Sequence, residues 1–473
     1  MPRPLPFTIA RVARRVVLAI AAFMVLGLSI VSQPAKRLSD FDQSFYITIA
    51  YDLDRHGVFS NGVFDDVDST AAAPPAGMFF VPAYPLLVLA SMKIDRRFAE
   101  AVACSVEAHH KHRDGTTCEP YATPMHIIHA LLLALGVLAI AVAGELICKT
   151  KSVFWFAGAL ATASLVAETD IFSFVMTESL TFALGSVFAL ALVLAWTTAS
   201  VRHFILAGCS LGALCLTRPS FLVLFPVAAA LCLLNGYRLT VPRQKYVGAH
   251  VLAFTVAFAL VLGSWVARNA FSVGKLGLTE EYGSAVLIER FAYNDMTAWE
   301  FALAFPYCTP GIGDIAFDPI YGTDSMHRFV YHTPDSFFHM GRGRRDALVK
   351  QHGRLDPLIG GIVRDEMRAN WWRHLLVSAP LAWCGMWVGW TWSLLLVPLF
   401  GYACVRAVRQ SQPLLLLYAA PAITMLGLHA AVANHYTRYN LILIGPFAVG
   451  AAWVISAWIP SVRQRSRAFA PGP

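Results

Sequence analysis

The residues that could carry chemistry are a few acids and arginines in an otherwise apolar chain. The acids are Asp40, Asp42 and Glu178, and the arginines are Arg218, Arg268 and Arg438. A positioned carboxylate can remove a proton from a hydroxyl group. An arginine binds phosphate in a bidentate fashion and stays charged when it is partly buried. Together, these residue types suit a reaction that needs a base and also binds an anion.

The composition indicates that these residues belong to an integral membrane protein. Of the 473 residues 57% are hydrophobic and only 14% are charged, which is too little polar sequence to cover a soluble protein of this length. The net charge of +8 comes from short basic clusters between apolar runs. Because such clusters are typical of membrane topology, we expect membrane lipids as partners and exclude nucleic acid.

About ten runs are apolar and nearly long enough to cross a membrane, which predicts an all-α polytopic fold. Basic residues follow every second run, and this places both chain ends in the cytoplasm. The first run has no small-residue cleavage site after it, so a retained helix is favoured over a signal peptide. The expected spans are 13–33, 125–147, 152–168, 171–197, 203–217, 219–236, 246–267, 376–402, 412–433 and 438–459.

This topology places two large loops on the exoplasmic side. The first loop is 34–124, and the second, 268–375, joins the seventh and eighth spans. We divide the chain into an N-terminal transmembrane catalytic module 1–267, which includes the first loop, the exoplasmic loop region 268–375, and C-terminal transmembrane helices 376–473. A short apolar piece near 78–92 is either re-entrant or interfacial.

The polar residues converge on that exoplasmic side. Arginines at the outer ends of spans run against the positive-inside bias, and charged groups at membrane depth mark function by default. The alternative, helix caps and snorkelling side chains, explains some of them but not the recurrence of arginine. The same face also carries four candidates for lining a substrate site, namely Tyr46, Asp170, His435 and Tyr439.

Six short motifs, in order along the chain, resemble those of one enzyme superfamily. They are Asp42-Gln-Ser-Phe-Tyr46, Pro82-Ala-Tyr-Pro85, Met176-Thr-Glu178, Thr217-Arg218-Pro219, Trp265-Val-Ala-Arg268-Asn269 with Gly274, and Arg438-Tyr439. Together they resemble the GT-C membrane glycosyltransferases, in particular the protein O-mannosyltransferases and the lipid A aminoarabinose transferases. The resemblance covers residues 10–300 well and the last hundred loosely.

The resemblance implies an inverting hexosyl or pentosyl transferase with a polyprenyl-phosphate-sugar donor. The acceptor would be a lipid, a glycan or a protein outside the cytoplasm, and the active site would face the periplasm or exterior from a bacterial inner membrane. Asp42, Asp40 and Glu178 are the catalytic candidates, while Arg218, Arg268 and Arg438 would bind the donor phosphate. Asp40 and Asp42 both remain candidates for the base, and Asp42 could instead be an N-cap.

The same charges leave two other classes of protein open. These are a transporter or flippase of lipid-linked sugars, which usually carries its charges near the midplane, and a non-enzymatic subunit.

The sequence assigns no cofactor and identifies no metal ligand, although a requirement for a divalent cation stays open. Cys104 and Cys118 share one loop and form a disulfide only if that loop is oxidised. Cys384 lies in an apolar run and is interpreted as a packing residue.

The second loop has three further features. Its histidines match no metal motif and are interpreted as solvated. Its basic run of Arg342, Arg344 and Arg345 suits either an anionic acceptor or lipid headgroup or an ordinary solvated cluster. Residues 357–374, with the paired Trp371 and Trp372, predict an amphipathic helix on the membrane surface.

Overall fold

The computed structural model describes residues 9–62, 73–110, 118–238, 247–331 and 333–459. Within these residues the chain is helical, and no strand occurs. Among the described residues, seven helices are long and apolar enough to cross a membrane, and four shorter apolar helices accompany them. The all-α polytopic prediction is therefore confirmed, whereas the number of about ten spans stays a prediction.

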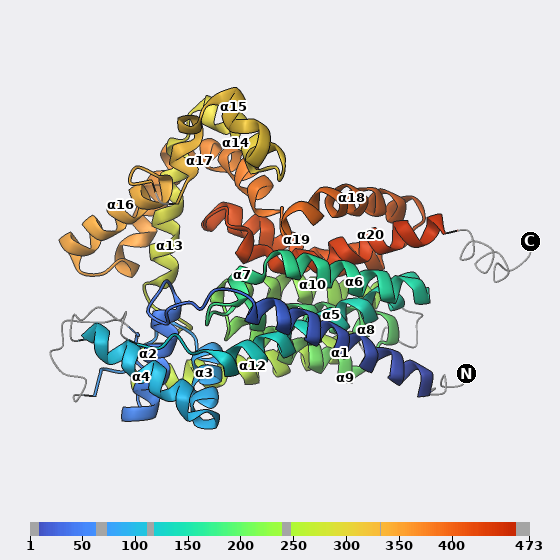
Figure 1. Cartoon of the computed structure of the whole chain (residues 1–473), viewed down its shortest axis with the longest axis horizontal. Helices are drawn as coiled ribbons and strands as arrows, with labels where there is room; N and C mark the ends of the chain where they lie inside the picture. The colour runs from blue at the N-terminus through green and yellow to red at the C-terminus, as the bar shows by residue number, and fades with distance from the viewer. Residues whose placement is uncertain (1–8, 63–72, 111–117, 239–246, 332, 460–473) are drawn as a thin grey trace, which may run out of the picture.

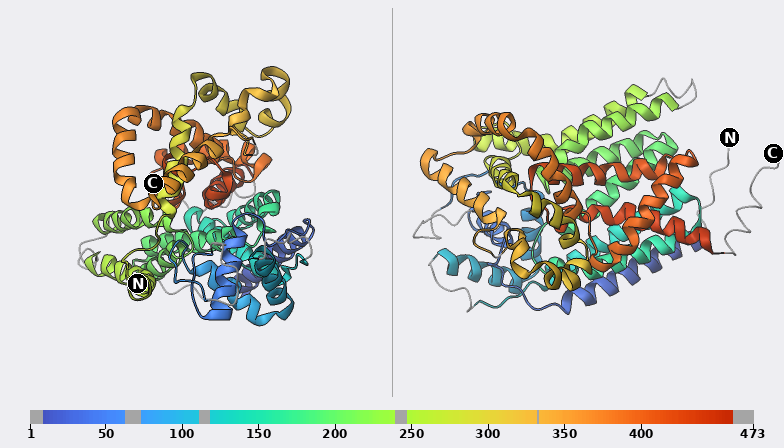
Figure 2. Two further views of the ribbon diagram at one scale, coloured as in Figure 1. Left: turned by 90° about the vertical axis from the view of Figure 1, so that its left-hand side faces the viewer. Right: turned by 90° about the horizontal axis from the view of Figure 1, so that it is seen from above.

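The apolar helices lie side by side in one bundle (Figure 1). α5 is at its centre and packs against α1, α6, α8 and α20. α1 begins and α20 ends at the same end of the bundle, as Figure 1 and the right-hand view of Figure 2 show. The bundle helices are α1 (Ile9–Val31), α5 (Thr123–Cys148), α6 (Lys151–Ala167), α8 (Glu178–Thr198), α9 (Val201–Cys215), α10 (Leu224–Arg238), α12 (Val247–Ser272), α18 (Ser393–Arg409), α19 (Leu414–Val432) and α20 (Ile444–Trp458).

The opposite end of the bundle, here called the loop end, carries the remaining helices (Figure 1). Two short 3-10 segments, η2 (Pro219–Val223) and η7 (Thr437–Leu443), directly precede the bundle helices α10 and α20. The other loop-end elements are α2 (Gln43–His56), α3 (Ala83–Ile94), α4 (Arg96–His110), α7 (Thr169–Phe172), α13 (Tyr282–Phe291), η3 (Ala292–Asp295), α14 (Ala298–Cys308), η4 (Gly313–Phe317), α15 (Asp318–Tyr321), η5 (Thr323–Phe329), α16 (Phe337–His352), α17 (Asp356–Gly385) and η6 (Trp390–Trp392).

Two predicted spans have different limits in the structure. The predicted span 376–402 is wrong, because its first part belongs to α17, which ends at Gly385, and a new helix, α18, begins at Ser393. Gly389 has a φ of 85°, a left-handed conformation that breaks a helix, and hydropathy windows do not register such a break. The predicted span 171–197 begins later, at Glu178, because the chain turns between α7 and α8.

The loop end has hydrophobic cores of its own. Leu38, Tyr51, Phe98 and Val106 are among the residues that join α2, α3 and α4, and Tyr293, Phe329, Phe337 and Leu381 are among those that join η3, η5, α16 and α17. The predicted helix 357–374 lies within α17, where Trp371 and Trp372 are exposed. Its helical state is confirmed, and its position on the membrane surface stays a prediction.

Two disulfides fasten the loop-end helices. Cys104 of α4 is bonded to Cys118, which settles the pairing that the sequence left open. Cys308 at the end of α14 is bonded to Cys384 near the end of α17. The interpretation of Cys384 as a packing residue is therefore wrong. The sequence could not reveal the bond, because the two cysteines are 76 positions apart and no local pattern links them.

Candidate active site

The first pair of charges at the loop end joins the start of α2 to η7. Arg438 donates from Nη2 to Oδ2 of Asp42 at 3.2 Å, and the Asp42 side chain is 50% exposed. Asp42 occupies the N-cap position of α2 but makes no capping hydrogen bond with its side chain. Its carboxylate therefore faces Arg438 and solvent, and the capping alternative does not account for it. We call Asp42–Arg438 the outer pair.

A second pair lies deeper, between the start of α8 and the turn before η2. Arg218 donates from Nη2 to Oε1 of Glu178 at 2.6 Å and from Nε to Oγ1 of Thr177 at 2.8 Å. The side chains of Glu178 and Arg218 are only 3% and 16% exposed. A buried ion pair is stable only when its geometry is good, since both charges lose their hydration. We call Glu178–Arg218 the inner pair.

Tyr439 links the two pairs. The guanidinium carbons of Arg438 and Arg218 lie 5.1 Å and 5.4 Å from the centre of its ring. Arg438 also donates to its hydroxyl oxygen at 3.2 Å. Cations over the face of a tyrosine ring are attracted by its quadrupole. Tyr439 therefore holds two arginines on one surface, next to the exposed carboxylate of Asp42.

Two further tyrosines border this cluster. Burial raises the pKa of Tyr46, and the nearby Asp42 carboxylate raises it further. Burial likewise raises the pKa of Tyr282, with Tyr439 and then Asp42 as the next causes. Both phenols therefore stay protonated at neutral pH and are available as hydrogen-bond donors. Sequence reasoning named Tyr46 but missed Tyr282, because a tyrosine at the start of a loop helix has no distinguishing pattern.

Buried hydrogen bonds position the start of α2. Gln43 is fully buried, accepts from the backbone N–H of Val175 at 3.0 Å, and donates to the carbonyl of Arg37 at 2.5 Å. Because Val175 lies just before α8, this amide ties the chain beside Asp42 to the chain beside Glu178. Tyr84, from the Pro82-Ala-Tyr-Pro85 motif of the first loop, packs edge-on against Tyr46, with the ring centres 5.1 Å apart.

Two other predicted residues, Arg268 and Asp170, have partners outside the cluster of the two pairs, and Asp40 lies in the turn before α2. Arg268 donates to the carbonyls of Gly77 at 2.5 Å and Phe59 at 2.9 Å, and so fastens α12 to the first loop. Asp170 pairs with Lys36 at 2.5 Å on an exposed surface. The backbone N–H of Asp40 donates to the carbonyl of Arg37 at 3.1 Å, within the turn before α2.

His435 lies on the second-loop side of the cluster. Its Nδ1 is 3.3 Å from the hydroxyl of Tyr293, and burial lowers its pKa to about 4. The imidazole is therefore neutral at physiological pH. It contributes a hydrogen-bonding group and aromatic packing to this side of the site, and no charge.

A separate acidic cluster is the candidate for a cation site. One carboxylate oxygen from each of Glu280, Glu281 and Asp356 lies within 4.8 Å of the others. Glu280 pairs with Lys275 and Arg354. Glu281 accepts from the N–H of Leu355 at the start of α17, and Asp356 accepts from the N–H of Glu281 at the start of α13. Reciprocal helix capping and two cations thus account for the cluster without a metal ion.

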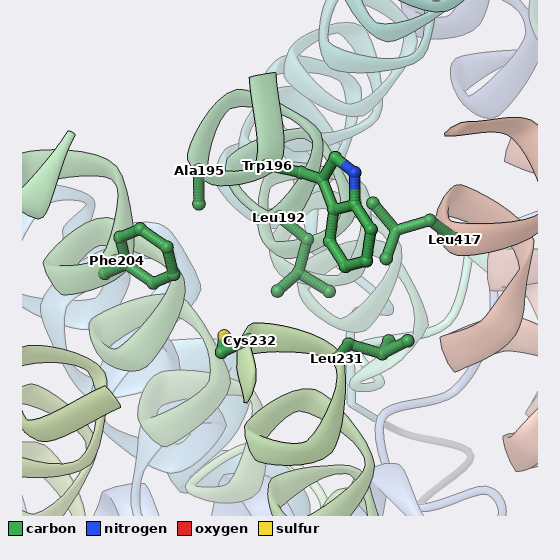
Figure 3. Close-up of a pocket in the computed structure, with 7 residues that line it drawn as sticks. All are labelled: Leu192, Ala195, Trp196, Phe204, Leu231, Cys232 and Leu417. Atoms are coloured by element: carbon green, nitrogen blue, oxygen red, sulfur yellow. The ribbon is translucent and has the colours of Figure 1, made fainter. Parts of the chain in front are cut away.

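The structure also contains a small apolar pocket, which Figure 3 shows. It is formed where α8, α9, α10 and α19 meet, and Leu192, Trp196, Phe204 and Leu417 are among its lining residues. Leu192 is 14 positions after Glu178 on the same helix, which corresponds to roughly 20 Å along the axis. This pocket therefore belongs to the bundle interior and not to the polar site.

No protein-family model and no curated protein sequence matches the chain. Among solved structures it is similar to the archaeal oligosaccharyltransferase AglB from Archaeoglobus fulgidus in complex with an inhibitory peptide and a dolichol-phosphate (TM-score 0.47, 12% identity, 98% of this chain and 53% of that chain). It is also similar to ArnT from Cupriavidus metallidurans, bound to undecaprenyl phosphate (TM-score 0.36, 14% identity, 92% and 77% covered) and in the apo state (0.35, 14%, 93% and 78%).

This chain thus spans about half the length of the oligosaccharyltransferase. Both neighbours are membrane glycosyltransferases of the GT-C superfamily, the superfamily that the six motifs resemble. With TM-scores this low, the likeness by itself assigns no activity to the chain.

Proposed function

We propose that this protein is a membrane glycosyltransferase that moves a hexose or pentose from a polyprenyl-phosphate donor to an acceptor on the non-cytoplasmic face, with inversion. The observation that carries the proposal is the exposed carboxylate of Asp42 beside two arginines held on one tyrosine ring. A base next to an anion-binding surface is what displacement of a phosphate by a hydroxyl group requires.

The reaction exchanges one bond for another. The acceptor hydroxyl attacks the anomeric carbon of the donor, and the bond from that carbon to the phosphate oxygen breaks. Asp42 takes the proton of the hydroxyl, while Arg438 and Arg218 stabilise the charge on the leaving polyprenyl phosphate. Because the buried Glu178 neutralises and orients Arg218, it acts as a positioning residue rather than as the base.

The outer pair suggests an order of binding. Before the donor binds, Arg438 is engaged by Asp42 at 3.2 Å, a long and partly exposed ion pair that is worth little on its own. A donor phosphate offers Arg438 more oxygen atoms and more charge than one carboxylate does. Donor binding would therefore draw Arg438 away and free Asp42 to accept a proton from the acceptor.

The disulfides support the proposed sidedness. Cys104–Cys118 and Cys308–Cys384 belong to loop-end helices, and disulfides persist in oxidising compartments. We therefore propose that the loop end faces the periplasm or exterior from a bacterial inner membrane. A cysteine introduced at the exposed Lys350 should react with an impermeant maleimide in intact cells, and one at Lys149 should not. The reverse labelling pattern would overturn this orientation.

The base is tested with purified protein in nanodiscs and a panel of radiolabelled undecaprenyl-phosphate hexoses and pentoses. Envelope lipids and glycans from a strain that lacks the gene serve as acceptors. Asp42→Asn keeps the size of the side chain but cannot take up a proton, so turnover should fall roughly a hundred- to ten-thousand-fold with the fold preserved.

Asp40→Asn is the matched control, since it makes the same change two positions away. An inactive Asp40→Asn variant beside an active Asp42→Asn variant would move the base to Asp40. Full activity in both variants would overturn the mechanism. Movement of the lipid across the membrane without sugar transfer would establish the transporter class instead.

A further inference from the structure

A chain of aromatic rings leads from the surface of α16 to the two arginines of the site. Phe338, Tyr331 and Tyr436 form this chain, which we call the aromatic run. Ring centres are 4.7 Å apart between Phe338 and Tyr331, and 6.2 Å apart between Tyr331 and Tyr436. Tyr436 is in turn 6.2 Å from Tyr439. All three rings of the run are half-buried, so part of each remains accessible.

Arg342, which has no carboxylate within hydrogen-bonding distance in the part of the chain that the structure describes, lies at the outer end of this run. Arg344 pairs with Asp295, and Arg345 pairs with Glu289 at 2.6 Å. Arg342, by contrast, is 3.9 Å from Glu289 and lies 5.0 Å above the centre of the Phe338 ring. Its side chain is 46% exposed. Of the three arginines on α16, Arg342 is therefore the one available for an anion.

The inner part of the run contains a hydroxyl group that lacks a partner. The Oη atom of Tyr436 is buried and has no hydrogen-bond partner among the described residues. A buried polar atom without a partner costs about 1–3 kcal/mol, so it marks a position where a ligand atom would be favourable. A ligand that carries hydroxyl groups supplies such an atom.

The helix that presents Phe338 and Arg342, α16, is packed closely against α13. A Cβ on Gly341 of α16 would lie 2.6 Å from the carbonyl oxygen of Glu289 of α13, so the two helices touch at this glycine. Ser336 caps the start of α16 by accepting from the N–H of His339 at 3.3 Å. Figure 1 shows α13 and α16 at the same end of the bundle as α2. The outer end of the run, Phe338 with Arg342, is therefore held against α13.

We propose that the aromatic run and Arg342 form the acceptor subsite, and that the acceptor is a glycan with an acidic group. This inference rests on the proposed function. The C–H face of a sugar ring is apolar and packs against aromatic rings, while its hydroxyl groups need polar partners. The run offers rings at successive positions, the Tyr436 hydroxyl offers a hydrogen bond, and Arg342 recognises the acid.

The test measures glycan binding without catalysis. Saturation-transfer NMR is recorded on the whole protein in nanodiscs with a hyaluronan tetrasaccharide, which alternates glucuronic acid and N-acetylglucosamine, and with its carboxyl-reduced form. Arg342→Gln should weaken binding of the acidic form about tenfold or more, the scale for losing a charged hydrogen bond, and leave the reduced form unchanged. Tyr331→Ala should weaken binding of both forms.

Two matched variants control for general damage to the fold. Arg344→Gln changes an arginine two positions away that already has a carboxylate partner in Asp295, and Tyr321→Ala removes an exposed tyrosine from α15. Neither should alter binding of either tetrasaccharide. If the wild type binds neither form, or if all four variants bind the acidic form equally, the subsite is overturned. If Arg342→Gln and Arg344→Gln weaken binding of the acidic tetrasaccharide equally, the acid is attracted by the general positive charge of α16 and the specific role of Arg342 is overturned.

A second ligand separates this inference from the proposed function. Undecaprenyl phosphate should bind equally to the wild type and to the Arg342→Gln and Tyr331→Ala variants, because these residues lie outside the phosphate surface. If undecaprenyl phosphate binds and the glycan does not, the subsite fails while the donor site stands. If the glycan binds and undecaprenyl phosphate does not, the proposed function fails. Binding of a lipid or peptide acceptor in place of the glycan would reassign the acceptor class.

Discussion

The inner and outer pairs use the same kinds of residue in different environments. Glu178–Arg218 is buried at 2.6 Å, with a further hydrogen bond to Thr177, whereas Asp42–Arg438 is 3.2 Å long and its acid is half exposed. A buried charge cannot leave its partner without a large desolvation cost, but an exposed one can. The inner pair is thus suited to fix the geometry, and the outer pair is suited to exchange its partner.

The largest effect should follow from breaking the inner pair. Arg218→Met leaves the Glu178 carboxylate buried without its cation, and should lower the free energy of unfolding by about 3–5 kcal/mol. Denaturant titration in detergent measures this loss. The double variant with Glu178→Gln should recover part of the stability, because the orphaned charge is gone. Equal stability of Arg218→Met and wild type would show that the inner pair has no structural role.

Breaking the outer pair should have the opposite profile. Arg438→Ala should lower the free energy of unfolding by less than Arg218→Met does, because its partner Asp42 is half exposed and stays hydrated when the arginine is removed. It should nevertheless weaken binding of undecaprenyl phosphate by about 2–5 kcal/mol, and Arg438→Lys should restore only part, since the bidentate geometry is lost. Calorimetry on nanodiscs gives both affinities.

Arg268→Ala is the control for this variant. Its guanidinium is committed to the carbonyls of Gly77 and Phe59. We therefore expect lower stability and nearly unchanged affinity for undecaprenyl phosphate. A loss of affinity as large as in Arg438→Ala would return Arg268 to the donor site, where the sequence placed it.

A smaller effect should come from His435, whose protonation makes the free energy of unfolding depend on pH. Burial lowers the pKa of His435 to about 4, so the unfolded chain, with a histidine pKa of about 6.5, takes up its proton first. This contribution is complete above about pH 6.5 and is lost as the pH falls toward 4. The loss should be of order 1–3 kcal/mol. His435→Gln should flatten the unfolding profile in this window, and an unchanged slope would contradict the burial of this imidazole.

Several residues of the candidate site could be proposed from the sequence because each stands at a recognisable local motif. Asp42 four positions before Tyr46, Glu178 after Met-Thr, and Arg438 before Tyr439 were all identified from the chain alone. Their partners were not. Arg268 belonged to the same set by type and position, yet it binds backbone carbonyls, because the folded first loop brings Gly77 and Phe59 against α12. Residue type and depth cannot distinguish an arginine awaiting an anion from one already satisfied.

The division of the chain into three parts stays a prediction, and the site draws on all of them. Asp42, Glu178 and Arg218 come from 1–267, Tyr282 from 268–375, and Arg438 from 376–473. Removing any one part would therefore leave the cluster incomplete. The three parts are therefore segments of the sequence, and none of them contains the whole candidate site.

The sequence by itself determined that the chain is embedded in a membrane and carries charges on one face. It did so because apolar content, run length and the spacing of basic clusters are local properties. Only the tertiary structure decided which acid meets which arginine, which cysteine pairs with Cys384, and that Tyr282 and Tyr436 border the site. Asp42 and Arg438 are 396 positions apart, and a contact over that distance depends on how every intervening helix packs. Local patterns carry no information about such packing.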